Sequence, residues 1–129
     1  EYFAREIEPL LGDGVEIVGE CGLADKLHLL AGAAALVNPI QWPEPFGLVM
    51  IEALACGTPV ISCPRGAAPE IVDDGVTGFL RTDHDGLVDA LGRVGELDRA
   101  ACRDAMVRRF STRRMVADHL DCYRSLLKA

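Results

Sequence analysis

Two glutamates, Glu44 and Glu52, are separated by seven residues and lie on either side of a glycine, Gly47. Glu52 is the only ionisable residue in an otherwise apolar stretch that predicts a helix from about residue 46 to 56. A helix that is apolar all round is buried, and a buried carboxylate needs compensation. We therefore expect Glu52 either to reach a cleft or to pair with another polar group.

The start of this predicted helix suits an anion. Gly47 has no Cβ, so a ligand can approach the free N–H groups of the first turn and meet the positive end of the helix dipole. Glu52 stands roughly 7–8 Å further along the axis at about 1.5 Å per residue, which is about the reach from a diphosphate to its ribose. Glu44 precedes the helix, on the side where a sugar would lie. The spacing alone predicts an anion site flanked by hydroxyl-rich groups.

The stretch from Glu44 to Val60 reads EPFGLVMIEALACGTPV. It resembles the E-x7-E signature of GT-B glycosyltransferases, particularly the retaining family 4 (glycosyl transferases group 1). Glu70 to Leu80 resembles the E-x4-G-x-T-G-x-L turn of that family, and the likeness runs from about Val15 to the C-terminus. Ala67 departs from the pattern, because the family often has a glycine pair there.

The resemblance implies a role for each matching residue. Glu44 would hydrogen-bond the donor hexose and is the residue expected to act in catalysis, while Glu52 would accept from the ribose hydroxyls. The loop after Gly19, through Leu23 and Lys26, would border the nucleobase. Backbone contacts to the sugar and the distal phosphate would come from Phe46, Gly47 and Leu48.

The same resemblance implies the reaction and the partners. The donor would be a nucleotide diphosphate sugar, with no metal or other cofactor, and the hexose would be transferred with retention. The acceptor-binding N-terminal domain, and the Arg and Lys that stabilise the departing phosphate, would lie upstream, so the chain alone would be inactive. Two alternatives remain open: a non-catalytic nucleotide-sugar-binding module, and a sugar epimerase or phosphorylase of the same fold. A dinucleotide oxidoreductase is not expected, since no G-x-G-x-x-G follows a strand.

Composition excludes several other classes. The net charge is −7, and residues 1–64 carry nine acids but two bases, which disfavours nucleic-acid binding. No run approaches the ~20 apolar residues that span a bilayer, so membrane contact is expected only through the rest of the parent enzyme. The odd number of cysteines, without a CxxC pair, indicates free buried thiols and a cytoplasmic location. The scattered histidines predict no metal site.

Some features have simpler interpretations than ligand binding. Trp42 is expected to pack within its loop rather than over the sugar, and Glu70 to be an acid of a first helical turn. A basic cluster is interpreted as a solvated helix junction: Arg108, Arg109, Arg113 and Arg114.

The elements that must position these residues alternate. Short β-branched runs predict strands at 15–19, 35–37, 60–63 and 79–81. Helical periodicity and end signals predict helices at 2–11, 23–31, 46–56, 70–73, 84–94, 98–109 and 112–129. Gly57 is expected to end the third helix, and Ser111 or Thr112 to cap the last. Strands alternating with helices indicate an α/β, Rossmann-like, doubly wound parallel sheet. We expect a nucleotide-sugar-binding domain at 1–110, truncated at its N-terminus, and a C-terminal helix at 111–129.

Overall fold

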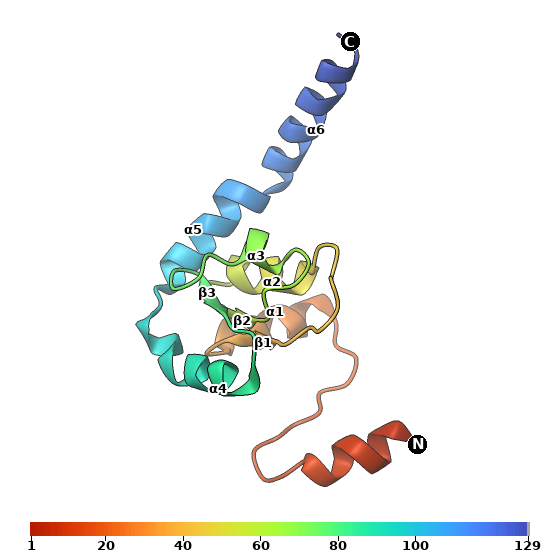
Figure 1. Ribbon diagram of the computed structural model, residues 1–129, viewed down its shortest axis with the longest axis vertical. Coiled ribbons are helices and arrows are strands. Elements are labelled where there is room, and N and C mark those ends of the chain that lie inside the picture. Colours follow the sequence, from red (N-terminus) through yellow and green to blue (C-terminus); the bar gives the residue numbers. More distant parts are fainter. Residues whose placement is uncertain (129) are drawn as a thin grey trace.

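Three short parallel strands form the sheet in the computed structural model, which describes residues 1–128 (Figure 1). The strands are β1 (Leu36–Asn38), β2 (Val60–Ser62) and β3 (Gly78–Leu80), and they lie in the order β1-β2-β3. Val60 pairs with Leu36 on one side and with Gly78 on the other. The predicted parallel α/β arrangement is confirmed, with each of these strands within one residue of its expected start.

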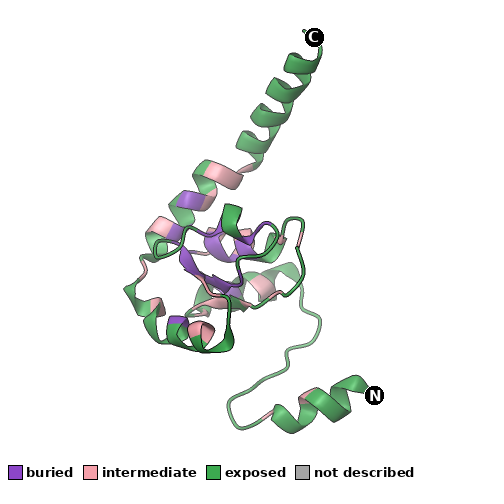
Figure 2. Ribbon diagram, in the orientation of Figure 1, coloured by how far each residue is buried: buried purple, intermediate pink, exposed green. Residues whose placement is uncertain are grey.

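Helices cover both faces of the sheet. They are α1 (Leu23–Gly32), α2 (Leu48–Ala55), α3 (Ala68–Ile71), α4 (His84–Arg93), α5 (Arg99–Phe110) and α6 (Thr112–Leu126). Because side chains alternate along a strand, Val60 joins a core with α1, α2, α3 and α5, whereas Ile61 and Phe79 pack against Ala90 of α4. Buried residues gather in the sheet and the helices against it (Figure 2). The doubly wound arrangement is therefore confirmed.

The helix ends follow local signals in the sequence. Helix α2 ends at Ala55, just before Gly57, as predicted, and Ser111 caps α6 by accepting a hydrogen bond from the N–H of Arg114. Asp83 caps α4 in the same way through the N–H of Gly86. These caps fix where each helix begins beside the strand that precedes it.

The N-terminal segment departs from the prediction. The expected helix at 2–11 is a π-helix, η1 (Phe3–Ile7), followed by a 3-10 helix, η2 (Glu8–Leu10). The strand predicted at 15–19 is wrong, because these residues pair with no strand among residues 1–128, and Val15 and Ile17 are more than half exposed. A β-branched run becomes a strand only when a neighbouring strand accepts its hydrogen bonds. The short helix α3 also begins two residues earlier than the expected 70–73.

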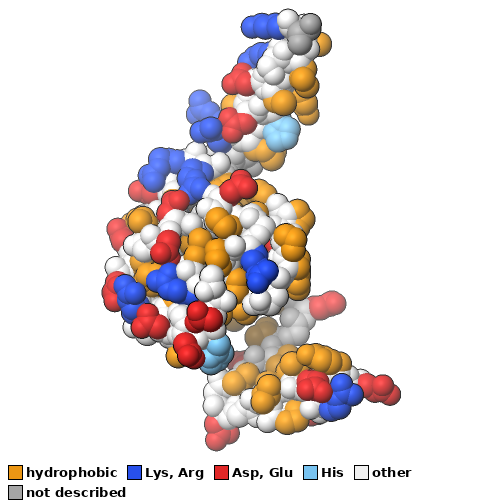
Figure 3. Space-filling view, viewed as in Figure 1, with side chains coloured by type: hydrophobic (Ala, Val, Ile, Leu, Met, Phe, Trp, Pro, Cys, Tyr) orange, Lys and Arg blue, Asp and Glu red, His pale blue; other side chains and the backbone are white. Residues whose placement is uncertain are grey.

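Helix α6 extends away from the body of the molecule, on the side opposite the N-terminal segment (Figure 1). Hydrophobic side chains follow one side of it (Figure 3). They are exposed and include Met115, Val116, Leu120, Tyr123 and Leu127. Within residues 1–128 no helix is both long and apolar enough to cross a membrane. The division at residue 110 stays a prediction, although α5 ends at Phe110 and α6 begins at Thr112.

Candidate functional site

Gly47 opens the N-terminus of α2 in the left-handed conformation, with φ +78°. This conformation favours glycine, whereas an added Cβ would meet mainly the flexible end of the Met50 side chain, with the Cε at 2.5 Å. Within the part of the chain that the structure describes, the N–H groups of Gly47, Leu48 and Val49 donate no hydrogen bond. Three free donors and the helix dipole make this end of α2 suitable for an anion.

Glu52, one turn and a half further along α2, is held by Lys26 of α1. The Lys26 Nζ lies 2.6 Å from the Glu52 Oε1, and both side chains are about one-third exposed. Of the two expectations for Glu52, pairing with a polar group is the one observed, and its partner is itself a predicted site residue. Leu23, which is 67% exposed, begins α1 one turn before Lys26, while Gly19 lies in the unpaired segment that precedes this helix.

Glu44 is held in the loop between β1 and α2 by both its side chain and its backbone. Its Oε2 accepts a hydrogen bond from the indole N–H of Trp42, at 3.1 Å. Its carbonyl oxygen accepts one from the N–H of Ala67, at 2.9 Å. Gly66 lies directly against the same peptide, because a Cβ on Gly66 would be 2.3 Å from the carbonyl oxygen of Glu44. Trp42 therefore contacts Glu44 within its own loop but is 60% exposed, and its expected packing role stays a prediction. The loop is tied to the turn after β2.

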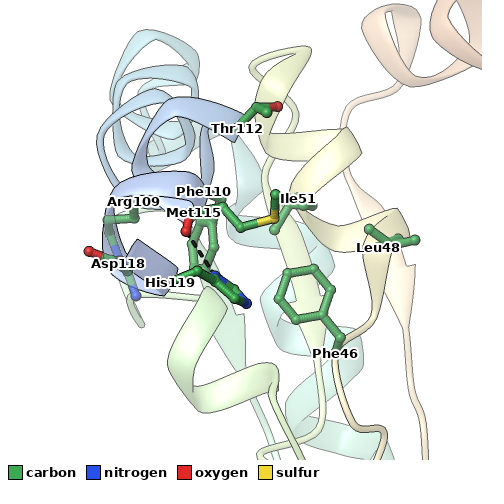
Figure 4. A pocket seen from close by; sticks show the side chains of 9 residues that line it. All are labelled: Phe46, Leu48, Ile51, Arg109, Phe110, Thr112, Met115, Asp118 and His119. Carbon is green, nitrogen blue, oxygen red and sulfur yellow. Dashed lines mark hydrogen bonds between the residues drawn. The ribbon is translucent and has the colours of Figure 1, made fainter. Parts of the chain in front are cut away.

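The ring of Phe46 points into an apolar groove of about 480 Å³ between α2 and the α5–α6 junction, which Leu48 also lines (Figure 4). The rings of Phe46 and Phe110 meet edge to face with their centroids 6.5 Å apart. Met115 and His119 of α6 face them from across the groove. The Phe46 side chain thus packs against Phe110, whereas Leu48 is 63% exposed, and the backbone of both residues remains available for the contacts predicted of them.

A smaller cavity of about 170 Å³ lies at the carboxyl ends of β2 and β3, lined by Cys63, Pro64, Arg65 and Thr82. Arg65 was not among the residues predicted for the site. The signal that could have identified it is its isolation, since it is the only Lys or Arg between Lys26 and Arg81. In open α/β sheets ligands bind beyond the carboxyl ends of the strands.

The basic cluster at the α5–α6 junction is partly neutralised. Arg109 contacts Asp73 at 2.8 Å and also donates to the carbonyl oxygen of Glu70. Arg114 contacts Asp118 at 2.8 Å, one turn along α6. Arg109 and Arg114 thus offset nearby acids, and the interpretation of the whole cluster as a solvated helix junction stays a prediction.

The cysteines differ in burial, and the described residues form no cluster of metal ligands. All five thiols are free, but only Cys63 and Cys102 are buried, so the expectation of buried thiols is wrong for the exposed Cys21 and Cys122. Residues 1–128 contain no group of three or more His, Cys, Asp or Glu side chains placed to hold a metal ion.

Comparison with known protein families gives one match that spans most of the chain. The family model described as Glycosyl transferases group 1 matches residues 1–96. The chain is 44% identical over 104 residues to the D-inositol 3-phosphate glycosyltransferase of Saccharomonospora viridis, covering 75% of this chain and 24% of that protein. It is 42% identical over 108 residues to the enzyme of the same name from Salinispora tropica, covering 77% and 22%. The chain thus spans about a quarter of the length of these relatives.

A solved structure resembles most of the described chain. The crystal structure of Anabaena Alr3699/HepE in complex with UDP-glucose superposes with a TM-score of 0.68 and 26% identity, over 92% of this chain and 34% of the other. A second structure of the same protein, in complex with UDP and glucose, matches with the same TM-score and covers 33% of that chain.

Proposed function

Because the chain belongs to the family of group 1 glycosyl transferases and has the α/β fold of GT-B enzymes, we propose that it forms the donor-binding part of a retaining glycosyltransferase. The donor is a nucleotide diphosphate hexose, and the acceptor is bound by a domain outside residues 1–129. The similar HepE structure contains UDP-glucose, so a uridine diphosphate sugar is the first donor to test. As in the sequence-based expectation, the transfer needs no metal.

One observation carries this proposal: the free N–H groups at the start of α2 lie between two acceptor side chains, Glu44 before the helix and Glu52 within it. The diphosphate binds these N–H groups, which are backbone donors fixed in place before the ligand arrives. The ribose hydroxyls donate to the Glu52 carboxylate, and the hexose hydroxyls donate to Glu44. Lys26 holds the Glu52 carboxylate toward α1, so the ribose meets an acceptor that is already oriented.

Calorimetric titration of the chain with UDP, UDP-glucose and 2′-deoxy-UDP tests these roles. Glu52→Ala removes hydrogen bonds to a charged acceptor, each worth about 1.5–3 kcal/mol, so we expect UDP affinity to fall by roughly tenfold or more. The wild-type preference for UDP over 2′-deoxy-UDP should vanish in the same variant. Glu44→Ala should weaken UDP-glucose more than UDP. GDP- and ADP-glucose show whether uracil is the preferred base.

Two controls separate ligand contacts from side effects. Asp104→Ala removes one negative charge from an exposed position of α5 and should leave every affinity unchanged. The double variant Lys26→Ala/Glu52→Ala tests whether an unpaired lysine, rather than a lost ribose contact, weakens binding. Full recovery of UDP affinity in the double variant, or equal losses for UDP and UDP-glucose in both single variants, contradicts the assigned roles.

A further inference from the structure

Lys26 lies in α1, Arg65 follows β2 and Arg81 follows β3, and of these three cations only Arg65 is unpaired within residues 1–128. Lys26 contacts Glu52 at 2.6 Å, and Arg81 contacts Asp74 at 2.8 Å. The guanidinium of Arg65 is exposed and makes no hydrogen bond or ion pair with any of residues 1–128. In a chain of net charge −7, a cation that no acid neutralises is available to a ligand.

Arg65 is placed at a cavity rather than on an open convex surface. It lies in the turn after β2, and Thr82 follows β3, so the cavity of about 170 Å³ that they line with Cys63 and Pro64 lies where two neighbouring strands end. A water molecule occupies about 30 Å³ in the liquid, so this space accommodates a phosphate or carboxylate group. Ligands of open α/β sheets bind in this region, beyond the carboxyl ends of the strands.

The turn that carries Arg65 is fixed to the loop that carries Glu44. The N–H of Ala67 donates to the Glu44 carbonyl oxygen at 2.9 Å, and Gly66 approaches that peptide too closely to accept a Cβ. No side chain separates the two backbones at this contact. The backbone that carries Arg65 is thus fixed beside the loop of the residue that contacts the hexose under the proposed function.

We propose that Arg65 is an anion-binding residue of a second subsite, which recognises a phosphate or carboxylate carried by the sugar being transferred or by the acceptor. The inference rests on the proposed function, which places the reacting sugar at Glu44. Guanidinium groups bind both anions through two parallel hydrogen bonds. Asp83, which follows the cavity-lining Thr82 in the chain, is engaged elsewhere, since its carboxylate accepts the N–H of Gly86 at the start of α4, at 2.8 Å.

The test uses Arg65→Ala and Arg65→Lys in the intact chain, with Arg108→Ala as the matched control. Arg108 is exposed on α5 and has no hydrogen-bond or ion-pair partner within residues 1–128, so its removal changes the net charge equally. Alanine keeps the backbone hydrogen bonds of residue 65, and circular dichroism checks the fold. Affinities are measured for inorganic phosphate, with and without UDP, and for UDP, UDP-glucose and UDP-glucuronate.

Loss of a charge-assisted hydrogen bond predicts a change of roughly tenfold or more in Arg65→Ala and a smaller one in Arg65→Lys. A loss confined to UDP-glucuronate places the anion on the donor sugar. A loss for inorganic phosphate that persists with UDP bound, without a loss for UDP-glucuronate, places it on the acceptor. If Arg65→Ala matches Arg108→Ala for every probe, the subsite is refuted, while UDP binding still supports the donor site. If UDP fails to bind the wild-type chain, the donor site is refuted, and phosphate binding that depends on Arg65 still supports an anion site.

Discussion

Gly66 determines how closely the turn after β2 approaches the loop of Glu44, and Gly66→Ala should disrupt both stability and sugar binding. The residue adopts φ +54°, in the left-handed region. An added Cβ would lie 2.3 Å from the Glu44 carbonyl oxygen, 2.4 Å from the Glu44 nitrogen and 2.8 Å from the Pro43 carbonyl carbon. These are backbone atoms that cannot rotate away, so one of the two loops must move.

The magnitude follows from two separate costs. A left-handed conformation costs a residue other than glycine about 1–2 kcal/mol. Forcing an extra carbon into a packed contact costs about 1–3 kcal/mol more. We therefore expect Gly66→Ala to lower the free energy of unfolding by about 2–5 kcal/mol.

Gly75→Ala is the matched control. Gly75 also has a positive φ, +76°, but a Cβ there would meet no atom within 4 Å. It should carry only the conformational cost of about 1–2 kcal/mol. Urea denaturation of both variants, monitored by circular dichroism, measures the difference.

The functional consequence is specific to the sugar. Because the movement displaces Glu44 and leaves the Lys26–Glu52 pair in place, Gly66→Ala should weaken UDP-glucose binding more than UDP binding. Equal free energies of unfolding for Gly66→Ala and Gly75→Ala would refute the steric reasoning. Equal loss of UDP and UDP-glucose affinity in Gly66→Ala would refute its link to Glu44.

Two further predictions concern titratable groups. Burial raises the pKa of Asp74, but hydrogen bonds from the Leu80 N–H and the Arg81 guanidinium outweigh this effect and hold the pKa below its usual value of 3.8. The ionised Asp74 carboxylate therefore stabilises the fold above about pH 4, and this contribution is lost as the pH falls through the lowered pKa. Asp74→Asn should therefore lower the urea midpoint at pH 6 and do so progressively less below pH 4; a constant difference across this range would contradict the assignment. Burial raises the pKa of the Cys102 thiol, so iodoacetamide at pH 8 should modify the exposed Cys21 and Cys122 and spare Cys102 until urea unfolds the chain. Mass spectrometry measures this order, and labelling of native Cys102 as fast as that of Cys122 would contradict it.

The local features of this protein were readable from its sequence, because each depends on residues within a few positions. Helix ends follow from caps such as Ser111, and the parallel sheet follows from short apolar strands that alternate with helices. The position of Gly47 at the start of α2 followed from the run of apolar residues after it. The ordered residues from Glu44 to Val60 also indicated the family, which the match over residues 1–96 confirms.

Tertiary structure decided the contacts between residues far apart in the chain. The run at 15–19 has the composition of a strand but lacks a neighbour to pair with in residues 1–128, and composition carries no information about neighbours. Lys26 and Glu52 pair across two helices, and Gly66 fixes the loop of Glu44 through a backbone contact that its own turn does not reveal. Arg65 reaches the carboxyl edge because β2 ends there beside β3. The sequence therefore determined most of the elements and the residue types of the proposed donor site, whereas packing between elements determined which side chains lie together.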